Sequence, residues 1–245
     1  MLAFDIETSP LDEEAVLKFA EPFKPPVHPG EFDSSGVKVG NIKDKDKITA
    51  KIAEAKQLHE AAVCGFEESC KLAEKEHIAN AIAQAALSPT TGKVLVIGYR
   101  AFDGRMAFDD GEGDESRIIT KFWSKYEKCR QQQRHMVGAN ILQFDLPFLV
   151  RRSWILGVDV PRTVKPNRWW DDIFVDIREA WLCGQRWGDC DSSLDVIARA
   201  LNVGEKIGDG ALFYQMWAED REKAIAYLRN DLEMTGLSAV KMGIV

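Results

Sequence analysis

Long apolar segments are missing from this sequence of 245 residues, and so is a leader with a basic start and an apolar stretch. No run approaches the roughly 20 apolar residues that a membrane-spanning helix needs. The first residues, MLAFD, are typical of a strand and not of a signal peptide. We therefore expect a protein that makes no contact with a membrane.

Metal-binding and disulfide patterns are also missing. The five cysteines are scattered and include no C-x-x-C pair, which argues against a zinc site or a disulfide framework and favours a reducing cytoplasm. The four histidines stand in no ligand spacing, which disfavours a zinc enzyme or a histidine base. These residues are Cys64, Cys70, Cys129, Cys183 and Cys190, and His28, His59, His77 and His135.

The sequence has fewer basic than acidic residues: it contains 32 Lys and Arg and 39 Asp and Glu, which gives a net charge of −7. An acidic chain is not the first expectation for a nucleic-acid binder, but net charge says little about local patches. Residues 151–168 carry five basic residues against Asp159, and could either face phosphates or form a solvated helix end and loop. Taken alone, they favour the second reading. The five are Arg151, Arg152, Arg162, Lys165 and Arg168.

The length suits one α/β domain over residues 1–245 with a large insertion. Hydrophobic periodicity predicts strands at residues 2–6, 93–99, 105–108, 136–140 and 173–177, and helices at 115–131, 192–201 and 220–242, with another following Asn140. Residues 22–40 are rich in proline and glycine and predict a loop. Residues 41–87 predict a helical insertion in the form of a hairpin. Three roles for this hairpin remain open: it packs on the domain, it clamps the substrate, or it forms a dimer contact.

Asp5 and Glu7 form a D-x-E pair at the end of the first strand. Residues i and i+2 of a strand point to the same face. Two adjacent carboxylates repel each other, and a divalent cation removes that penalty. D-x-E recurs elsewhere in the chain, so the apolar strand leading into Asp5 is what distinguishes this pair as a candidate metal site.

Two further elements carry acids. Asp145 follows the strand that ends at Asn140, where a helix should begin, and taken alone it suits a helix cap. Tyr227 and Asp231 are four residues apart on the last helix and therefore share one face. Taken alone, that pair also suits an ordinary amphipathic helix.

Together and in order, the D-I-E-T, N-x-x-x-F-D and Y-x-x-x-D elements resemble the DEDDy branch of the 3′→5′ exonucleases. The likeness is to the proofreading domain of family-B DNA polymerases, and more narrowly to stand-alone bacterial proteins predicted to be such exonucleases. Residues 86–99 and 193–195 are similar to the latter. A tyrosine, not a histidine, precedes Asp231 by four residues, which separates the chain from the DEDDh branch. The resemblance is weakest over residues 10–85.

The resemblance implies an α/β fold of the ribonuclease-H-like type, with a mixed five-stranded sheet flanked by helices and a helical insertion after the first strand. By position it implies four metal-binding acids, a tyrosine that orients the attacking water, and three residues that line the substrate cleft. These are Asp5, Glu7, Asp145 and Asp231, then Tyr227, then Thr8, Asn140 and Phe144.

The implied reaction is two-metal phosphoryl displacement, with Mg²⁺ or Mn²⁺ as the two ions because all the ligands are oxygens. The implied partner is a nucleic-acid 3′ end, most simply single-stranded DNA. Two alternatives remain open: the same chemistry on RNA, and a non-catalytic nucleic-acid-binding module on the same fold. Trp169 and Trp170 could stack on bases, although core packing is the simpler expectation. Asp171, Asp172 and Asp176 are expected at the surface or in caps.

Overall fold

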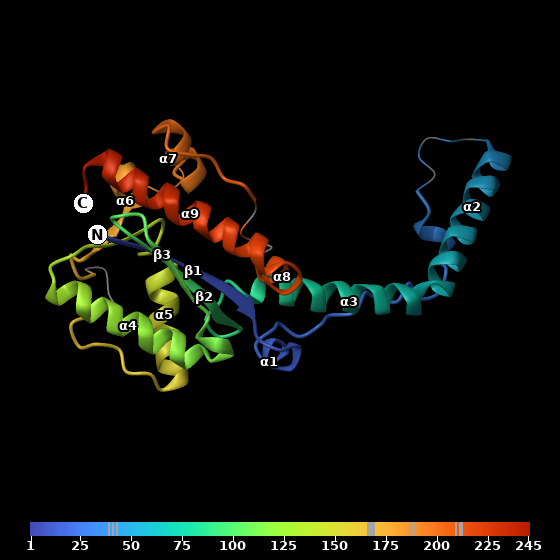
Figure 1. Ribbon diagram of the computed structural model, residues 1–245. Coiled ribbons are helices and arrows are strands. Elements are labelled where there is room, and N and C mark those ends of the chain that lie inside the picture. The colour runs from blue at the N-terminus through green and yellow to red at the C-terminus, as the bar shows by residue number, and fades with distance from the viewer. Residues whose placement is uncertain are drawn as a thin grey trace. The chain divides into compact units, whose positions relative to one another are not determined.

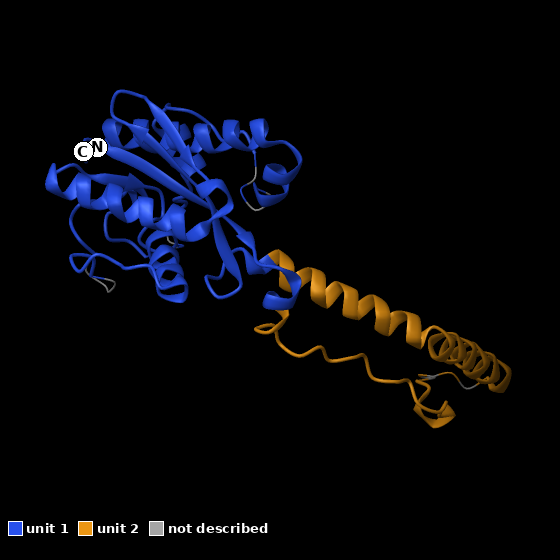
Figure 2. Cartoon of the chain, turned by 60° about the horizontal axis from the view of Figure 1, so that its bottom comes forward, with its two compact units in different colours: residues 1–16, 84–245 blue, residues 17–83 orange. Residues whose placement is uncertain are grey.

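The chain divides into two compact units in a computed structural model that describes residues 1–38, 40, 42, 44–165, 170–186, 188, 190–208, 210 and 213–245. Unit 1 comprises residues 1–16 and 84–245, and unit 2 comprises residues 17–83 (Figure 2). All of the predicted site residues belong to unit 1.

Unit 1 is built on a mixed five-stranded sheet in the order β3-β2-β1-β4-β5. β2 runs antiparallel to β1 and to β3, whereas β1, β4 and β5 are mutually parallel. The mixed five-stranded sheet expected from the sequence is therefore confirmed. The strands are β1 (Leu2–Pro10), β2 (Gly92–Ala101), β3 (Met106–Asp109), β4 (Met136–Gly138) and β5 (Phe174–Asp176).

Helices cover both faces of this sheet (Figure 1). One face carries α4 (Glu115–Gln131) and α5 (Asp145–Leu156), and the other carries α9 (Arg221–Met242). Shorter elements of unit 1 are α1 (Glu13–Leu17), whose last residue belongs to unit 2, η2 (Gly111–Gly113), α6 (Ile177–Leu182), α7 (Leu194–Ala200) and α8 (Phe213–Glu219). Within the described ranges, no helix has both the length and the apolar character needed to cross a membrane.

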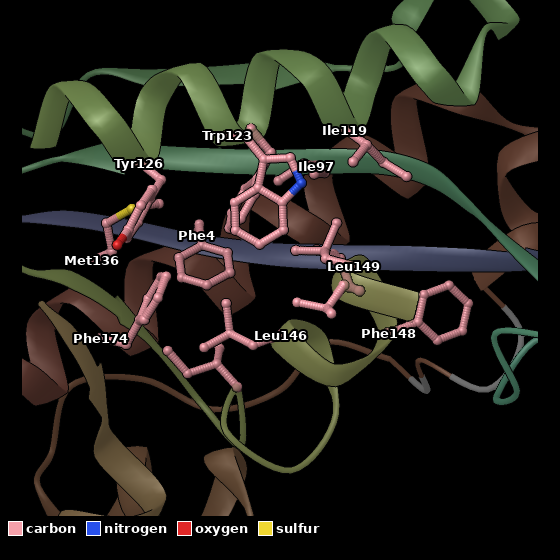
Figure 3. Close-up of a cluster of buried hydrophobic side chains, with 14 of the residues drawn as sticks. Phe4, Ile97, Ile119, Trp123, Tyr126, Met136, Leu146, Phe148, Leu149 and Phe174 are labelled. Carbon is pink, nitrogen blue, oxygen red and sulfur yellow. The ribbon is translucent and has the colours of Figure 1, made fainter. Parts of the chain in front are cut away.

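The main core lies between the sheet and α4 and α5 (Figure 3). Phe4 of β1 packs against Phe122 of α4, with ring centroids 5.2 Å apart. The indole N–H of Trp123 donates a hydrogen bond of 2.9 Å to the Ser153 hydroxyl on α5, which ties the two helices together. Because Phe4 and Ile6 occupy this side of β1, the alternate residues of the strand must face α9.

The long elements match their predicted positions. The helix predicted at 115–131 is α4, the one predicted at 192–201 is α7 with the Ser193 hydroxyl as its cap, and α9 begins after its cap Asp220. The short helices α1, α6 and α8 were not predicted, because five to seven residues hold too little periodicity to reveal a helix. Helix α7 is equally short, and its serine cap is the signal that predicted it.

Unit 2 contains η1 (Ser34–Gly36), α2 (Lys45–Cys64) and α3 (Phe66–Ala85), the last of which extends into unit 1. The two long helices meet end to end at Gly65 and do not fold back on each other as a hairpin (Figure 1). All residues of α2 are described and none is buried, whereas packing against α3 as a hairpin would have buried one face of α2.

The proline-rich segment runs beside these helices instead. The imidazole Nε2 of His77 donates a hydrogen bond of 2.9 Å to the carbonyl oxygen of Glu21, and Nε2 of His59 donates one of 3.2 Å to that of Gly30. The rings of His28 and Phe66 lie 4.6 Å apart. These contacts connect Glu21, His28 and Gly30 to α2 and α3.

A buried ion pair links α4 to α5. The guanidinium of Arg152 donates to both carboxylate oxygens of Glu115, at 2.9 and 2.6 Å, and to the carbonyl oxygen of Pro89 at 3.0 Å. The side chains of Arg152 and Glu115 are only 4% and 11% exposed. Arg152 therefore cannot face phosphates, as one reading of residues 151–168 allowed.

We predict that Arg152→Met lowers the free energy of unfolding by about 3–5 kcal/mol, because it leaves the Glu115 carboxylate buried without its partner. Arg151, the neighbouring exposed arginine, provides the matched control. Urea unfolding of Arg152→Met and Arg151→Met measures both effects. Equal losses in the two variants would contradict a stabilising role for the buried pair.

Candidate active site

Strand β1 directs two acids toward α9. Phe4 and Ile6 are buried in the main core, so Asp5 and Glu7 project from the opposite face of the sheet. The pairing register with β2 shifts directly after Glu7. Such an irregularity bends a strand and re-aims its side chains. Beyond it, the Thr8 hydroxyl donates a hydrogen bond of 2.7 Å to the carbonyl oxygen of Ala86.

Helix α9 presents Tyr227 and Asp231 to these acids. The two residues lie one turn apart and are 2% and 4% exposed. One carboxylate oxygen from each of Asp5, Glu7 and Asp231 lies within 4.8 Å of the others. The structure therefore brings together three acids that are more than 200 residues apart at their extremes.

Asp145 is the first residue of α5, but it does not cap that helix. The N-cap position belongs to Phe144, which makes no side-chain cap. Oδ1 of Asp145 accepts a hydrogen bond of 3.2 Å from the backbone N–H of Ile6, which lies between Asp5 and Glu7 on β1. The helix-cap reading is therefore wrong, and Asp145 is held against β1.

One cleft of about 350 Å³ is lined by all eight residues that the sequence singled out. They are Asp5, Glu7, Thr8, Asn140, Phe144, Asp145, Tyr227 and Asp231. The cleft lies at the carboxyl end of β4, where the chain leaves the sheet for α5. Parallel strands place ligand-binding residues at this edge in open α/β sheets.

The acids shift one another's protonation. Burial, followed by the negative charge of Asp231, raises the pKa of Asp5 to about 7. Burial and the charge of Asp5 also raise the pKa values of Glu7 and Asp145 well above their usual range. Because carboxylates held this closely favour protonation, a divalent cation would stabilise their charged forms.

Lys206 is a cleft residue that the sequence analysis missed. Its Nζ lies 3.3 Å from Oδ2 of Asp231 and 5.3 Å from the centre of the Tyr227 ring. Gly208 and Gly210 bring the same loop so close to Tyr227 that a Cβ on Gly210 would lie 2.9 Å from the hydroxyl oxygen. A single lysine in a loop has no periodic signal, although the density of glycines before α8 hinted at a close backbone approach.

The acids expected at the surface or in caps have separate roles. Asp171 accepts a hydrogen bond of 2.8 Å from the Tyr126 hydroxyl, away from the cleft. Asp176 caps α6, as expected, but it is buried and also binds the loop that carries Asn140. Trp170 packs edge-on against Phe174 at the core, with ring centroids 6.4 Å apart. Arg168 and Trp169 lie outside the described residues.

No model of a known protein family matches this sequence, and no curated protein matches it. Among solved structures, the family B DNA polymerase from the hyperthermophilic archaeon Pyrobaculum calidifontis is similar, with a TM-score of 0.53 and 23% sequence identity. The fold is ribonuclease-H-like. The likeness covers 65% of this chain and 23% of the polymerase chain, and it concerns the fold alone.

The acidic cluster fits a divalent cation. Oδ1 of Asp231 is buried and has no hydrogen-bond partner among the described residues, so a lone pair is left for a ligand. The carboxylate oxygens of Asp5 and Glu7 lie close enough to share that ligand, and an all-oxygen set suits Mg²⁺ or Mn²⁺.

We predict that Mn²⁺ raises the melting temperature of the wild-type protein, because it binds the folded state and relieves repulsion among the acids. Asp5→Ala should lose this increase. Asp12→Ala, a matched control outside the cleft, should keep it. Thermal unfolding with and without Mn²⁺ tests this, and an equal increase in wild type and Asp5→Ala would place the ions elsewhere.

Proposed function

We propose that this chain is a two-metal-ion 3′→5′ exonuclease, releasing nucleotides from single-stranded or frayed 3′ ends, with DNA as the favoured substrate. The observation that carries the proposal is the approach of Asp5, Glu7 and Asp231 to within 4.8 Å in a cleft shared with Tyr227. A protein that only bound nucleic acid would have no need to bury clustered negative charge against a polyanion.

Asp5, Glu7, Asp145 and Asp231 are the residues that would hold Mg²⁺ or Mn²⁺. Two such ions supply charge neutralisation at the phosphate and activation of water. The chain's own contribution is to keep the four carboxylates in place: β1 fixes two of them, the Ile6 N–H fixes Asp145, and α9 fixes Asp231.

Tyr227 suits the role of orienting the attacking water. Burial, followed by the negative charge of Asp231, raises the pKa of its hydroxyl above the usual range. A hydroxyl in that environment stays protonated near neutral pH, so it can position a water molecule by hydrogen bonding but cannot act as the base. Thr8, Asn140 and Phe144 then line the space for the terminal nucleotide.

The structural comparison supports the same proposal. The similar structure is that of a family B DNA polymerase, and the D-I-E-T, N-x-x-x-F-D and Y-x-x-x-D elements resemble the proofreading domain of that polymerase family. The acids of these three sequence elements line one cleft beside a ribonuclease-H-like sheet.

Matched DNA and RNA oligonucleotides, each labelled at the 5′ end and incubated with and without Mn²⁺, test the proposal. We expect a Mn²⁺-dependent ladder of shortened DNA, with RNA shortened more slowly. Faster shortening of RNA would make the protein an exoribonuclease. Binding of either strand without shortening would overturn the enzyme assignment in favour of a binding module.

A further inference from the structure

A separate cavity of unit 1 lies at the amino end of β1, whereas the acidic cleft lies toward the other end of that strand. Its volume is about 500 Å³, and the start of β1, the carboxyl end of α4 and the turn between β2 and β3 line it. Of the described residues that line this basic cavity, one is acidic, Asp103, and four are basic. The four are Arg105, Lys125, Lys128 and Arg134. This local surplus of positive charge contrasts with the net charge of −7 for the whole chain.

Backbone hydrogen bonds hold the loop that carries Arg134. The N–H of Arg134 donates a hydrogen bond of 2.9 Å to the carbonyl oxygen of Cys129, in the last turn of α4. The N–H of Leu2 donates one of 2.8 Å to the carbonyl oxygen of His135. The loop is therefore tied to both α4 and β1, and its arginine is placed at the rim of the basic cavity by fixed backbone.

The charges of Lys128 and Arg134 are available to a ligand. Neither side chain forms a hydrogen bond or an ion pair with another described residue. Arg105 is instead paired with Asp103, at 2.8 Å from nitrogen to oxygen. Lys128 also complements the negative end of the dipole of α4, because it lies in the last turn of that helix. Arg134 lies beyond the helix, so this local explanation does not account for it.

An aromatic ring lies beside these cations. Phe102 lines the basic cavity from the turn between β2 and β3, and it is 67% exposed. A hydrogen bond of 2.8 Å from the N–H of Ala101 to the carbonyl oxygen of Arg105 closes this turn. A single exposed apolar residue is common at protein surfaces. An aromatic ring next to unpaired cations, however, suits single-stranded nucleic acid, whose bases stack on the ring while its phosphates meet the cations.

The acidic cleft leaves most of a nucleic-acid strand without a positively charged surface. Its four acids repel phosphates, and Lys206, which also lines it, lies 3.3 Å from Oδ2 of Asp231. Metal ions bound to the acids would attract the phosphate at the 3′ end alone. Binding of the rest of a polyanionic strand therefore requires basic residues elsewhere on the protein.

We propose that the basic cavity binds the upstream part of the substrate strand, with phosphates at Lys128 and Arg134 and a base on Phe102, while the 3′ end of the same strand lies at the acids. This inference rests on the proposed exonuclease function, because it takes the substrate to be a nucleic-acid strand. The cavity thus serves as a second binding site, at the opposite end of β1 from the site of cleavage.

The double variant Lys128→Gln/Arg134→Gln should weaken binding of a long oligothymidylate on the order of tenfold, because it removes charge-assisted contacts. The slope of log binding constant against log salt concentration should fall by about 1.4, since each phosphate contact on a single strand contributes about 0.7. Fluorescence anisotropy in EDTA measures both quantities without cleavage.

Lys223→Gln/Lys241→Gln is the matched control for the change in net charge. These two lysines are exposed on α9, which covers the other face of the sheet. The control should keep the wild-type affinity and salt slope. If the two double variants lose equal affinity, the effect comes from net charge and the inference is wrong.

Phe102→Ala tests the contact with a base. It should weaken binding of oligothymidylate on the order of tenfold with little change in the salt slope, because stacking is lost and no charge is removed. A strand of abasic nucleotides should bind the wild type and Phe102→Ala equally well. If instead poly-glutamate binds the wild type as tightly as oligothymidylate does, and the charge variant abolishes that binding, the cavity is a site for acidic peptides and the inference is overturned.

Cleavage kinetics with Mn²⁺ test whether one strand reaches both sites. The double variant Lys128→Gln/Arg134→Gln should lose kcat/KM on long strands mainly through a higher KM, because the removed contacts bind the ground state and the transition state alike. The loss should be larger for long strands than for strands too short to reach the cavity. An equal loss at every length would contradict a site for the upstream strand.

The binding measurements separate this inference from the proposed function. If the wild type shortens no oligonucleotide but its affinity depends on Lys128, Arg134 and Phe102, the exonuclease function fails and the nucleic-acid site stands. If the wild type is an exonuclease but these variants bind as the wild type does, the second site fails alone. The charge variant should keep the Mn²⁺-induced rise in melting temperature, which shows that the acidic cluster is intact.

Discussion

Asp231→Asn is expected to reduce nucleotide release to near background while leaving the folded protein at least as stable as the wild type. The substitution removes a charged oxygen ligand from the cluster of three acids. It also removes a negative charge that raises the pKa values of Asp5 and Glu7, and so relieves repulsion in the metal-free protein. Single-turnover cleavage, Mn²⁺ titration and urea unfolding of the same samples measure the three consequences.

Glu233→Gln provides the matched control for this variant. Glu233 lies on the same helix two residues further on, is exposed, and completes another D-x-E pattern with Asp231. Its replacement should leave cleavage and Mn²⁺ binding unchanged. If Asp231→Asn binds Mn²⁺ and cleaves at the wild-type rate, the metal site proposed here is wrong.

Tyr227→Phe is expected to slow cleavage on the order of 10²-fold, the usual cost of losing one positioned polar group in an active site. The substitution keeps the ring, which packs against Phe213 with centroids 5.9 Å apart. Mn²⁺ binding and the free energy of unfolding should therefore stay close to wild type. Single-turnover rates at saturating enzyme separate the chemical step from substrate binding.

Tyr214→Phe is the control for loss of a tyrosine hydroxyl in the same region. Tyr214 lies on α8, does not line the cleft, and its hydroxyl accepts a hydrogen bond from the exposed Gln215. We expect no change in cleavage rate. Wild-type cleavage by Tyr227→Phe would reduce Tyr227 to a packing residue, and the DEDDy assignment would lose its mechanistic basis.

The local sequence was sufficient to predict the long elements of the fold. Helix α4 carries apolar residues on one face, and the structure gives it the predicted bounds. The alternation along β1 correctly separated Phe4 and Ile6 from Asp5 and Glu7. Both patterns are set by residues within a few positions of each other, so tertiary contacts did not need to be known.

Features that depend on distant partners were not predictable in this way. An Asp at the start of a helix can either cap that helix or accept a hydrogen bond from another element. Only the position of α5 beside β1 shows that Asp145 accepts a hydrogen bond from the backbone N–H of Ile6. Lys206 contacts Asp231, which lies 25 positions further along the chain, and no periodic signal in the sequence predicts this contact. The hairpin interpretation assumed that α2 had an apolar face to bury, but in unit 2 its residues stay accessible.

The most direct test of the proposed function compares linear and circular single-stranded DNA of the same sequence in the presence of Mn²⁺. If Asp5, Glu7, Asp145 and Asp231 hold the ions that act on a 3′ terminus, the 5′-labelled linear strand is shortened one nucleotide at a time. The circle stays intact under the same conditions. Cutting of the circle at a comparable rate, or release of the label as a mononucleotide in the first products, would contradict the account.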